Sequence, residues 1–197
     1  MISVLRKRSA RLVLLFVVVA LGVGLSGCGL NRTNATNVTQ DELSAGAEPY
    51  FNAGPITYQV QISRQLNPYD PIDVQFLTGI PTAQDLTPQQ FWFGVFLWAK
   101  NQTSKYVQTT DTFKLVDSSG QVFTPTPLPS VNPYAWTAQT LAPDGIQPAA
   151  DTAASDSSPG GGLILFKLTQ SVYSNRPLTL EVFAPGSTTP SRVSLDL

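Results

Sequence analysis

Few residues in this chain could carry out chemistry, and the absence of histidine restricts the possible reactions and metal sites further. The 197 residues include no histidine, one cysteine (Cys28) and one methionine. Hydrolases that rely on a histidine base, histidine-ligated zinc sites and His₂Cys copper sites are therefore excluded. Cys28 is the one nucleophilic thiol, so its surroundings decide which chemistry the chain can undergo.

The segment before Cys28 has the composition of an export signal. Four basic residues lie within the first eleven positions, and residues 12–25 are almost wholly apolar. As a helix these fourteen residues would reach about 21 Å, short of the roughly 30 Å hydrocarbon core of a bilayer. A cleaved signal peptide, residues 1–27, is therefore favoured over a permanent spanning helix.

The tetrad Leu25-Ser26-Gly27-Cys28 resembles the lipobox of bacterial lipoproteins. The resemblance implies that lipid is transferred to the thiol of Cys28 and that cleavage then falls between Gly27 and Cys28. The alternatives are an uncleaved anchor helix, or an ordinary signal with an incidental thiol. Because a lone cysteine in an exported chain needs an explanation, we expect attachment to the extracytoplasmic side of the cell membrane through lipid on Cys28.

The charge balance limits the class of partner. Residues 28–197 contain eight basic and thirteen acidic residues, a formal net charge of −5, and no basic cluster. Such a surface does not attract nucleic acid, and it disfavours tight binding to anionic headgroups. We therefore expect no nucleic-acid partner, and the membrane contact is assigned to the lipid.

Two sets of oxygen ligands are candidate chemical sites. Asn67, Asp70 and Asp73 could bind calcium from a loop, but Asn-Pro and Asp-Pro turns use the same residues, and the EF-hand spacing is missing. Asp70 and Asp73 could also meet Asp85 or Asp144 as a glycosidase pair, although nothing in the sequence marks them. We therefore predict no metal, no cofactor and no catalytic residues.

Aromatic residues form the remaining candidate site. Residues 91–99 read Phe-Trp-Phe-Gly-Val-Phe-Leu-Trp-Ala, a strand that is apolar on both faces. One face is an exposed binding patch or a core surface covered by the proline-rich segment, and the rarity of large exposed apolar patches favours the covered arrangement. The candidate patch consists of Trp92, Phe96, Trp98, Tyr134 and Trp136.

The elements that must position these residues are short strands. Residues 56–63 alternate, with Ile56, Tyr58, Val60 and Ile62 on one face and polar residues on the other. Further strands are predicted at 72–77, 91–99, 112–116, 121–124, 163–169, 178–184 and 191–197, with a hairpin loop at 117–120. No helix of three turns is visible after residue 28. The pattern predicts an all-β, antiparallel sandwich of about seven or eight strands.

The domain boundaries follow from composition. Residues 28–49 are polar and predict a disordered tether, followed by a sandwich domain over 50–197. A long loop rich in proline and alanine, residues 124–162, interrupts this domain. Its first half contains Tyr134 and Trp136 and is expected to pack on the sandwich, whereas 149–161 is expected to stay mobile.

Several motifs resemble the immunoglobulin-like "immunoprotective extracellular" domain family of secreted bacterial proteins and lipoproteins. These are the Asn101-x-Thr103 turn, Phe113-x-Leu115-x-Asp117-x-x-Gly120, Leu141-Ala142-Pro143-Asp144-Gly145 and Gly162-Leu163-Ile164-Leu165-Phe166. The resemblance covers roughly residues 58–183, with an insertion between the last two motifs. It implies an immunoglobulin-like fold of unknown function and brings no catalytic residues.

Together these features predict a non-enzymatic, lipid-anchored protein of the bacterial cell envelope that binds another envelope protein or a cell-wall component. The alternative is a small-ligand carrier with a pocket between the sandwich and the long loop.

Overall fold

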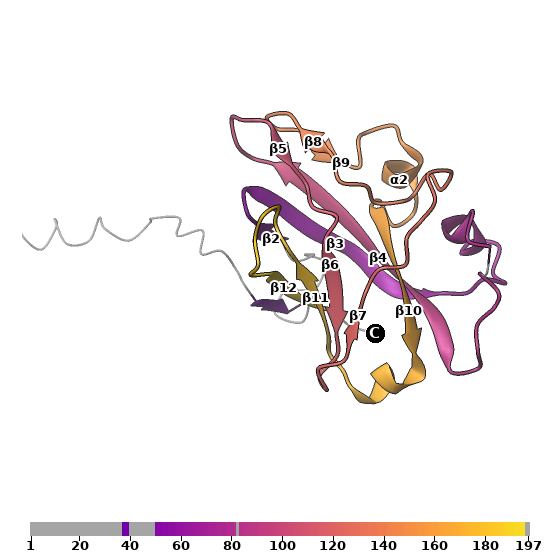
Figure 1. Cartoon of the computed structure of the whole chain (residues 1–197). Helices are drawn as coiled ribbons and strands as arrows, with labels where there is room; N and C mark the ends of the chain where they lie inside the picture. The colour runs from indigo at the N-terminus through magenta and orange to yellow at the C-terminus, as the bar shows by residue number, and fades with distance from the viewer. Residues whose placement is uncertain (1–36, 40–49, 82, 196–197) are drawn as a thin grey trace, which may run out of the picture. The chain divides into compact units, whose positions relative to one another are not determined.

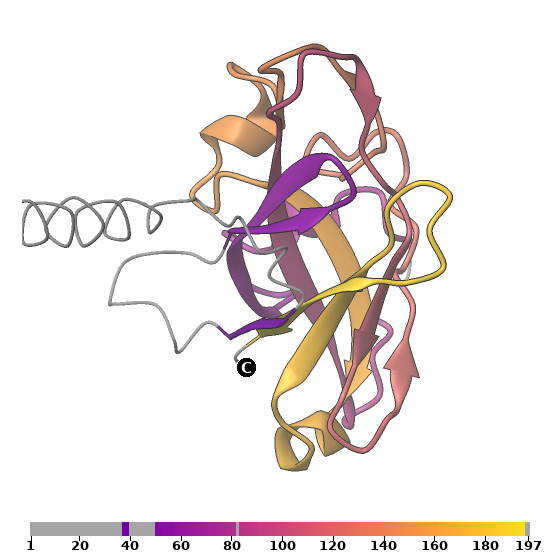
Figure 2. The same cartoon turned by 90° about the vertical axis from the view of Figure 1, so that its left-hand side faces the viewer.

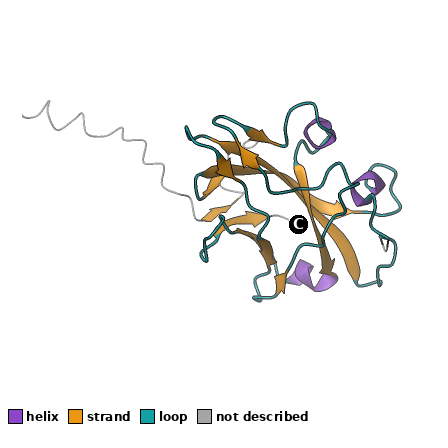
Figure 3. Ribbon diagram, turned by 45° about the horizontal axis from the view of Figure 1, so that its top comes forward, coloured by secondary structure: helices purple, strands orange, loops and turns teal. Residues whose placement is uncertain are grey.

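The computed structural model describes residues 37–39, 50–81 and 83–195, and two β-sheets dominate them (Figure 1). Both sheets contribute residues to one apolar cluster between them. Three short helical segments lie at the periphery of the strands in the described part of the chain (Figure 3). The predicted all-β sandwich is confirmed.

The first sheet is antiparallel, with the strand order β10-β4-β3-β2. Its strands are β2 (Tyr50–Ala53), β3 (Ile56–Leu66), β4 (Gln90–Asn101) and β10 (Gly162–Thr169). Beyond the end of β10, the two-residue strand β9 (Ile146–Gln147) pairs with β4. β4 is central and covered on both faces, which explains its run of apolar residues.

The second sheet has the order β1-β12-β11-β6-β7. Its strands are β1 (Asn37–Thr39), β6 (Phe113–Val116), β7 (Val122–Phe123), β11 (Leu178–Val182) and β12 (Ser191–Leu195). β1 pairs in parallel with β12, so residues 37–39 form a strand inside the segment predicted to be a disordered tether. The rest of residues 28–49 lies outside the described residues.

Seven of the described strands have four or more residues, in agreement with the predicted seven or eight. The others have two or three residues, including β5 (Val107–Gln108) and β8 (Thr140–Leu141), which pair with each other as a separate two-stranded sheet. The predicted hairpin at 117–120 joins β6 to β7.

The two sheets face each other (Figure 2). Alternate side chains of both sheets form the core between them, which we call the inner core. Fully burying each large apolar side chain contributes about 1.5–3 kcal/mol. The inner-core strand residues are, from the first sheet, Phe51, Ala53, Ile56, Tyr58, Val60, Phe91, Phe93, Val95, Leu97, Ala99, Ile164, Phe166 and Leu168, and, from the second, Phe113, Leu115, Phe123, Leu178, Leu180, Val182, Val193 and Leu195.

A β-bulge in β3 corrects one predicted face. Val60 pairs with Leu97, but Ile62 pairs with Phe96, so one extra residue stands between them. Because successive side chains alternate, the extra residue turns Ile62 to the outer face, where its side chain is 38% exposed. The prediction that Ile62 shares the face of Val60 is wrong.

A second apolar cluster, the outer core, covers part of the other face of the first sheet. Trp92 and Phe96 of β4 pack there with Leu66, under Phe76 and Leu77. These last two belong to the 3₁₀ helix η2 (Val74–Leu77), so the strand predicted at 72–77 is wrong. The main-chain N–H of Val74 bonds the carbonyl of Asp70, which starts a helical turn instead of an extended chain.

The proline-rich segment runs along the free side of β10, as expected for its first half. The N–H of Thr126 bonds the carbonyl of Leu165, and Tyr134 and Trp136 bond Leu163 through their main chains. In the second half, where the sequence predicts mobility, residues 153–156 form one helical turn, α2 (Ala153–Asp156). A capping box between Thr152 and Ser155 closes its N-terminus. A 3₁₀ helix, η3 (Gln170–Ser174), follows β10.

Candidate functional site

The lipidation and cleavage residues, Cys28 and Gly27, lie outside the described residues. Among residues 37–39, 50–81 and 83–195, no helix is both long and apolar enough to cross a membrane. The site can therefore be built only from the sandwich, starting with the five residues of the candidate aromatic patch.

These five residues are not brought together on one surface. Trp92 and Phe96 are buried in the outer core, and the Nε1–H of Trp92 donates to the carbonyl of Ala83 at 2.7 Å. Tyr134 covers them from the proline-rich segment, with its ring 4.8 Å from that of Phe76. Of the two alternatives for this face, the structure therefore has the core surface that the proline-rich segment covers.

Trp136 lies apart from Tyr134, against the inner core. Its ring is 6.1 Å from the rings of both Tyr58 and Phe113, and its Nε1–H donates to the carbonyl of Thr110 at 2.7 Å. Gly162 makes this possible, because a Cβ at that position would lie 2.9 Å from the Trp136 ring. Trp136 thus holds the proline-rich segment on the sandwich.

Trp98 is the member of the patch on β4 that stays partly exposed. It follows Phe96 by two residues on the outer face of β4, and its ring is 6.4 Å from that of Tyr50, edge to face at 79°. Tyr50 is 60% exposed. Sequence reasoning missed Tyr50 because this residue stands alone at the start of the domain, before any clear alternation begins.

The strand register explains why these two rings meet. Tyr50 of β2 pairs with Gln59 of β3, and Gln59 pairs with Trp98 of β4, so the three side chains form one row across the sheet. A second row lies on the same face, displaced by two residues along each strand, and it consists of Asn52, Thr57 and Lys100. We call these six residues together with Gln61 the aromatic–amide face.

Hydrogen bonds order the polar members of the aromatic–amide face. The Nε2–H of Gln61 donates to Oε1 of Gln59 at 2.8 Å, and the Oγ1–H of Thr57 donates to Oδ1 of Asn52 at 2.8 Å. Gln59 and Thr57 belong to the polar side that the alternation of 56–63 predicts, so the sequence did contain a signal for them. The face combines one exposed and one partly exposed ring with amides that are already oriented.

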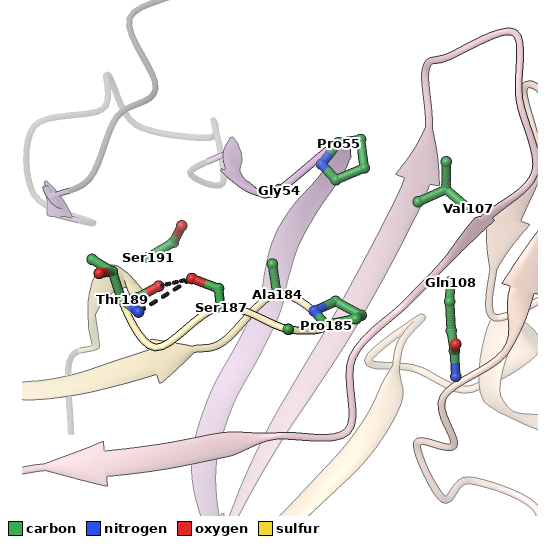
Figure 4. Close-up of a pocket in the computed structure, with 10 residues that line it drawn as sticks. Gly54, Pro55, Val107, Gln108, Ala184, Pro185, Ser187, Thr189 and Ser191 are labelled. Carbon is green, nitrogen blue, oxygen red and sulfur yellow. Dashed lines mark hydrogen bonds between the residues drawn. The ribbon is translucent and has the colours of Figure 1, made fainter.

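A pocket of about 580 Å³ lies at the end of the sandwich (Figure 4). It is open to solvent, and it is formed by the β2–β3 turn, by β5 and by the loop between β11 and β12. Pro55, Val107, Ala184 and Pro185 supply apolar surface, while Ser187, Thr189 and Ser191 lie along one side. Among the described residues that line it, none is charged and none belongs to the proline-rich loop. This pocket therefore does not lie between the sandwich and the long loop, where the sequence analysis places a ligand pocket.

The candidate calcium residues serve turn and ion-pair roles. Asp73 pairs with Arg64 at 2.5 Å and accepts the N–H of Asn67, while Asn67 and Asp70 accept N–H groups of Tyr69 and Ile72. Within the part of the chain that the structure describes, no three histidine, cysteine or carboxylate side chains form a group that could hold a metal ion.

Two groups in the described part of the chain have a shifted pKa. Burial raises the pKa of Tyr58 to about 12, although the hydrogen bond from the N–H of Thr110 acts in the opposite direction. Burial would also raise the pKa of Asp117, but hydrogen bonds from Ser119, Gln121 and Asn175 together hold that pKa below its usual value. Both groups connect loops to strands, and neither lines the pocket or the aromatic–amide face.

Comparisons with known proteins place the chain in no family. A scan against protein-family models and a search of curated proteins found no match. A solved structure with similarity is the crystal structure of the yjhA protein from Bacillus subtilis, with 13% sequence identity and a TM-score of 0.44. That match covers 75% of this chain and 96% of the other.

Proposed function

We propose that this chain is a lipoprotein of the bacterial cell envelope, held on the extracytoplasmic side of the membrane by lipid on Cys28. Its β-sandwich binds another envelope component and catalyses no reaction. The observation that carries the proposal is Leu25-Ser26-Gly27-Cys28, placed directly after a basic segment and a short apolar run. The resemblance to the lipobox supports processing at this site.

The physics of attachment supports the role of the lipid. One acyl chain gives marginal, reversible membrane binding, and each buried methylene adds about 0.8 kcal/mol. Two or three chains on one residue therefore make the attachment stable. The net charge of −5 over residues 28–197 adds no attraction to an anionic bilayer, so the anchor does not depend on the protein surface.

The use of buried polar groups supports binding over catalysis. Gln147 donates to the carbonyl of Thr137 and accepts from the hydroxyl of Thr109. Asn101 and Asp117 likewise bond the main chain of neighbouring turns. These groups hold loops on the sandwich, whereas the rings and amides of the aromatic–amide face are at least partly exposed to solvent, where a partner can reach them.

The anchor is tested with a Cys28→Ala variant and a Ser26→Ala control, which keeps a small residue and the thiol. The wild type and the control should remain in the membrane after a carbonate wash, with an acyl mass increment on a mature chain that begins at Cys28. The alanine variant at Cys28 should fold but leave the membrane. A Cys28→Ala protein that stays membrane-bound, or a mature wild type that begins elsewhere, would contradict the anchor.

Binding is tested with a photo-crosslinking amino acid placed at Trp98 in intact cells. The matched control carries it at Val122, which is 53% exposed on the second sheet. We expect a reproducible adduct from position 98 and none from position 122. The absence of an adduct at position 98, or equal adducts at both positions, would contradict a partner on the aromatic–amide face.

The open pocket favours a second candidate function, the carriage of a small uncharged ligand. Its apolar surface and neighbouring hydroxyl groups suit such a ligand better than an ionic one. An Ala184→Phe variant would narrow the pocket. If pocket carriage is the function, this variant should lose the ligand that co-purifies with the wild type, as measured by native mass spectrometry, and a wild type that carries no ligand would dismiss this candidate.

A further inference from the structure

We infer that the aromatic–amide face binds the neutral sugar units of an envelope polysaccharide. The inference rests on the proposed function and deepens it, because it names the chemical class of the component that is bound. It is carried by the rings of Tyr50 and Trp98, the amides beside them, and the absence of carboxylates from the two rows.

The two rings provide apolar surface of the width of one sugar chain. Adjacent strands are about 4.8 Å apart, so the main chains at Tyr50 and Trp98 are separated by roughly 10 Å, with Gln59 between them. The rings lean toward each other to a centroid distance of 6.4 Å, and this edge-to-face contact fixes the orientation of one ring against the other. An exposed aromatic ring beside polar groups suits the C–H face of a pyranose, whose edge carries hydroxyl groups.

The amides supply donors and acceptors for those hydroxyls. Gln61 donates to Oε1 of Gln59, which leaves both N–H groups of Gln59 and Oε1 of Gln61 without a partner among the described residues and open to a ligand. In the second row, Asn52 accepts from Thr57 and retains its own N–H groups as donors. Because the amides already bond one another or a neighbouring hydroxyl, less side-chain entropy is lost when a ligand binds.

The charges of the face favour an uncharged ligand. Lys100 is the one charged residue in the two rows. A cationic ligand finds no carboxylate in these rows. A single lysine also lacks the forked, bidentate geometry that holds a carboxylate or phosphate most firmly.

The extent of the face argues against a large protein partner. A stable protein interface buries about 800 Å² per partner around a largely apolar centre. The apolar residues that would extend this face along β4, Phe96 and Trp92, are buried under η2 and the proline-rich segment. Among the described residues, the exposed apolar surface on this side of the sheet thus consists of the two rings, Ile62 and Ile146, the β9 partner of Lys100, which suits a narrow chain of sugar units.

Titration of the full-length protein in detergent with neutral tetrasaccharides tests the inference. The probes are tetramers of glucose, mannose, galactose and N-acetylglucosamine, and binding is followed by calorimetry. At least one probe should bind, and Tyr50→Ala, Trp98→Ala and the double variant Gln59→Ala/Gln61→Ala should each weaken its binding about tenfold. Tyr106→Ala, which removes a ring that is 74% exposed outside the face, should leave the affinity unchanged.

Thermal melts establish which variants are folded. If Trp98→Ala does not fold, Tyr50→Ala still tests the inference. Failure of all four sugars to bind overturns the inference, and so does an equal loss of affinity in the Tyr106→Ala variant. A purely proteinaceous adduct at position 98, or quenching of Trp98 by brominated lipid vesicles, overturns it in favour of a protein or the bilayer. Any of these results leaves the lipid anchor standing, whereas a Cys28→Ala protein that stays on the membrane contradicts the anchor and not the sugar site.

Discussion

The side-chain amide of Asn101 donates to the main-chain carbonyl oxygen of Leu141, forty residues further along the chain, at 3.1 Å. The same amide donates to the carbonyls of Ala142 and Lys105, and its Oδ1 accepts the N–H of Thr103. Asn101 is fully buried. It therefore joins two turns that the sequence shows as separate motifs.

Replacing Asn101 by alanine should lower the free energy of unfolding by about 2–4 kcal/mol, since each buried group left without a partner costs about 1–3 kcal/mol. Asn101→Asp should be at least as destabilising at neutral pH, because it points a carboxylate at carbonyl oxygens. The measurement is urea denaturation, with the exposed Gln108→Ala as the control, which should stay within about 0.5 kcal/mol of wild type. An Asn101→Ala midpoint equal to that of the control would show that the bonds carry no stability.

The buried hydroxyl of Tyr58 predicts a loss of stability in alkali. Its pKa is raised from 10.0 to about 12 in the folded protein, so the neutral form is favoured there. The associated stability is complete below pH 10 and is lost as the pH rises toward 12. Tyr58→Phe should flatten this alkaline loss, while costing about 1–3 kcal/mol at neutral pH by leaving the N–H of Thr110 unpaired. Melting temperatures across the alkaline range measure both effects, and parallel curves for the two proteins would refute the assignment.

Asp117 predicts the opposite dependence, in acid. Its pKa is lowered below 3.8 because Ser119, Gln121 and Asn175 donate to the carboxylate and outweigh the effect of burial. The stabilisation is present at neutral pH and is lost as the pH falls through 3.8 toward the lower, native pKa. Asp117→Asn keeps an acceptor for the loop N–H groups but cannot titrate, so its acid limb should be shallower than that of wild type. Asp117→Ala should be destabilised by about 1–3 kcal/mol at neutral pH; identical acid limbs in wild type and Asp117→Asn would count against this role.

Two glycines should respond differently to the addition of one methyl group. A Cβ at Gly161 would lie 2.9 Å from main-chain atoms of Phe96 and Leu97, which are held in the centre of the sheet. At Gly94 it would meet the terminal methyl groups of Leu66 and Leu163 at 3.0 Å, and these can shift. Gly94→Ala should cost about 1–3 kcal/mol and Gly161→Ala more. Denaturation of the two variants side by side decides the order, and a reversed order would mean that the sheet yields more easily than the outer core.

Local patterns predict most of the sandwich because each long strand has its own alternation. β3, β4, β10, β11 and β12 all lie where apolar spacing places them. The error at 72–77 arises because a short apolar run does not distinguish a strand from a helical turn, and the hydrogen bond from Val74 to Asp70 decides it. Ile62 is misplaced because its face depends on the register with β4 and not on its neighbours in sequence.

The candidate site shows the same limit more strongly. Burial of Trp92 and Phe96 could be expected from the rarity of large exposed patches. The segment that covers them could not, because it depends on contacts between residues far apart in the sequence. Tyr134 and Trp136 are two residues apart, yet they pack in different cores, because the segment passes along β10. Tyr50 meets Trp98 through a register across three strands, and no spacing within one strand encodes that meeting.

The extra residue in β3 has a consequence for how the chain can change in length. Deleting Gln61 would leave Val60 opposite Leu97 and Ile62 opposite Phe96, so every side chain before and after it would keep its present orientation. β4 pairs with β10 without any such irregularity, and losing one residue from its middle would exchange inward and outward positions over half its length. The deletion of one residue should therefore preserve the fold at Gln61 of β3, whereas a deletion in the middle of β4 should disrupt both cores.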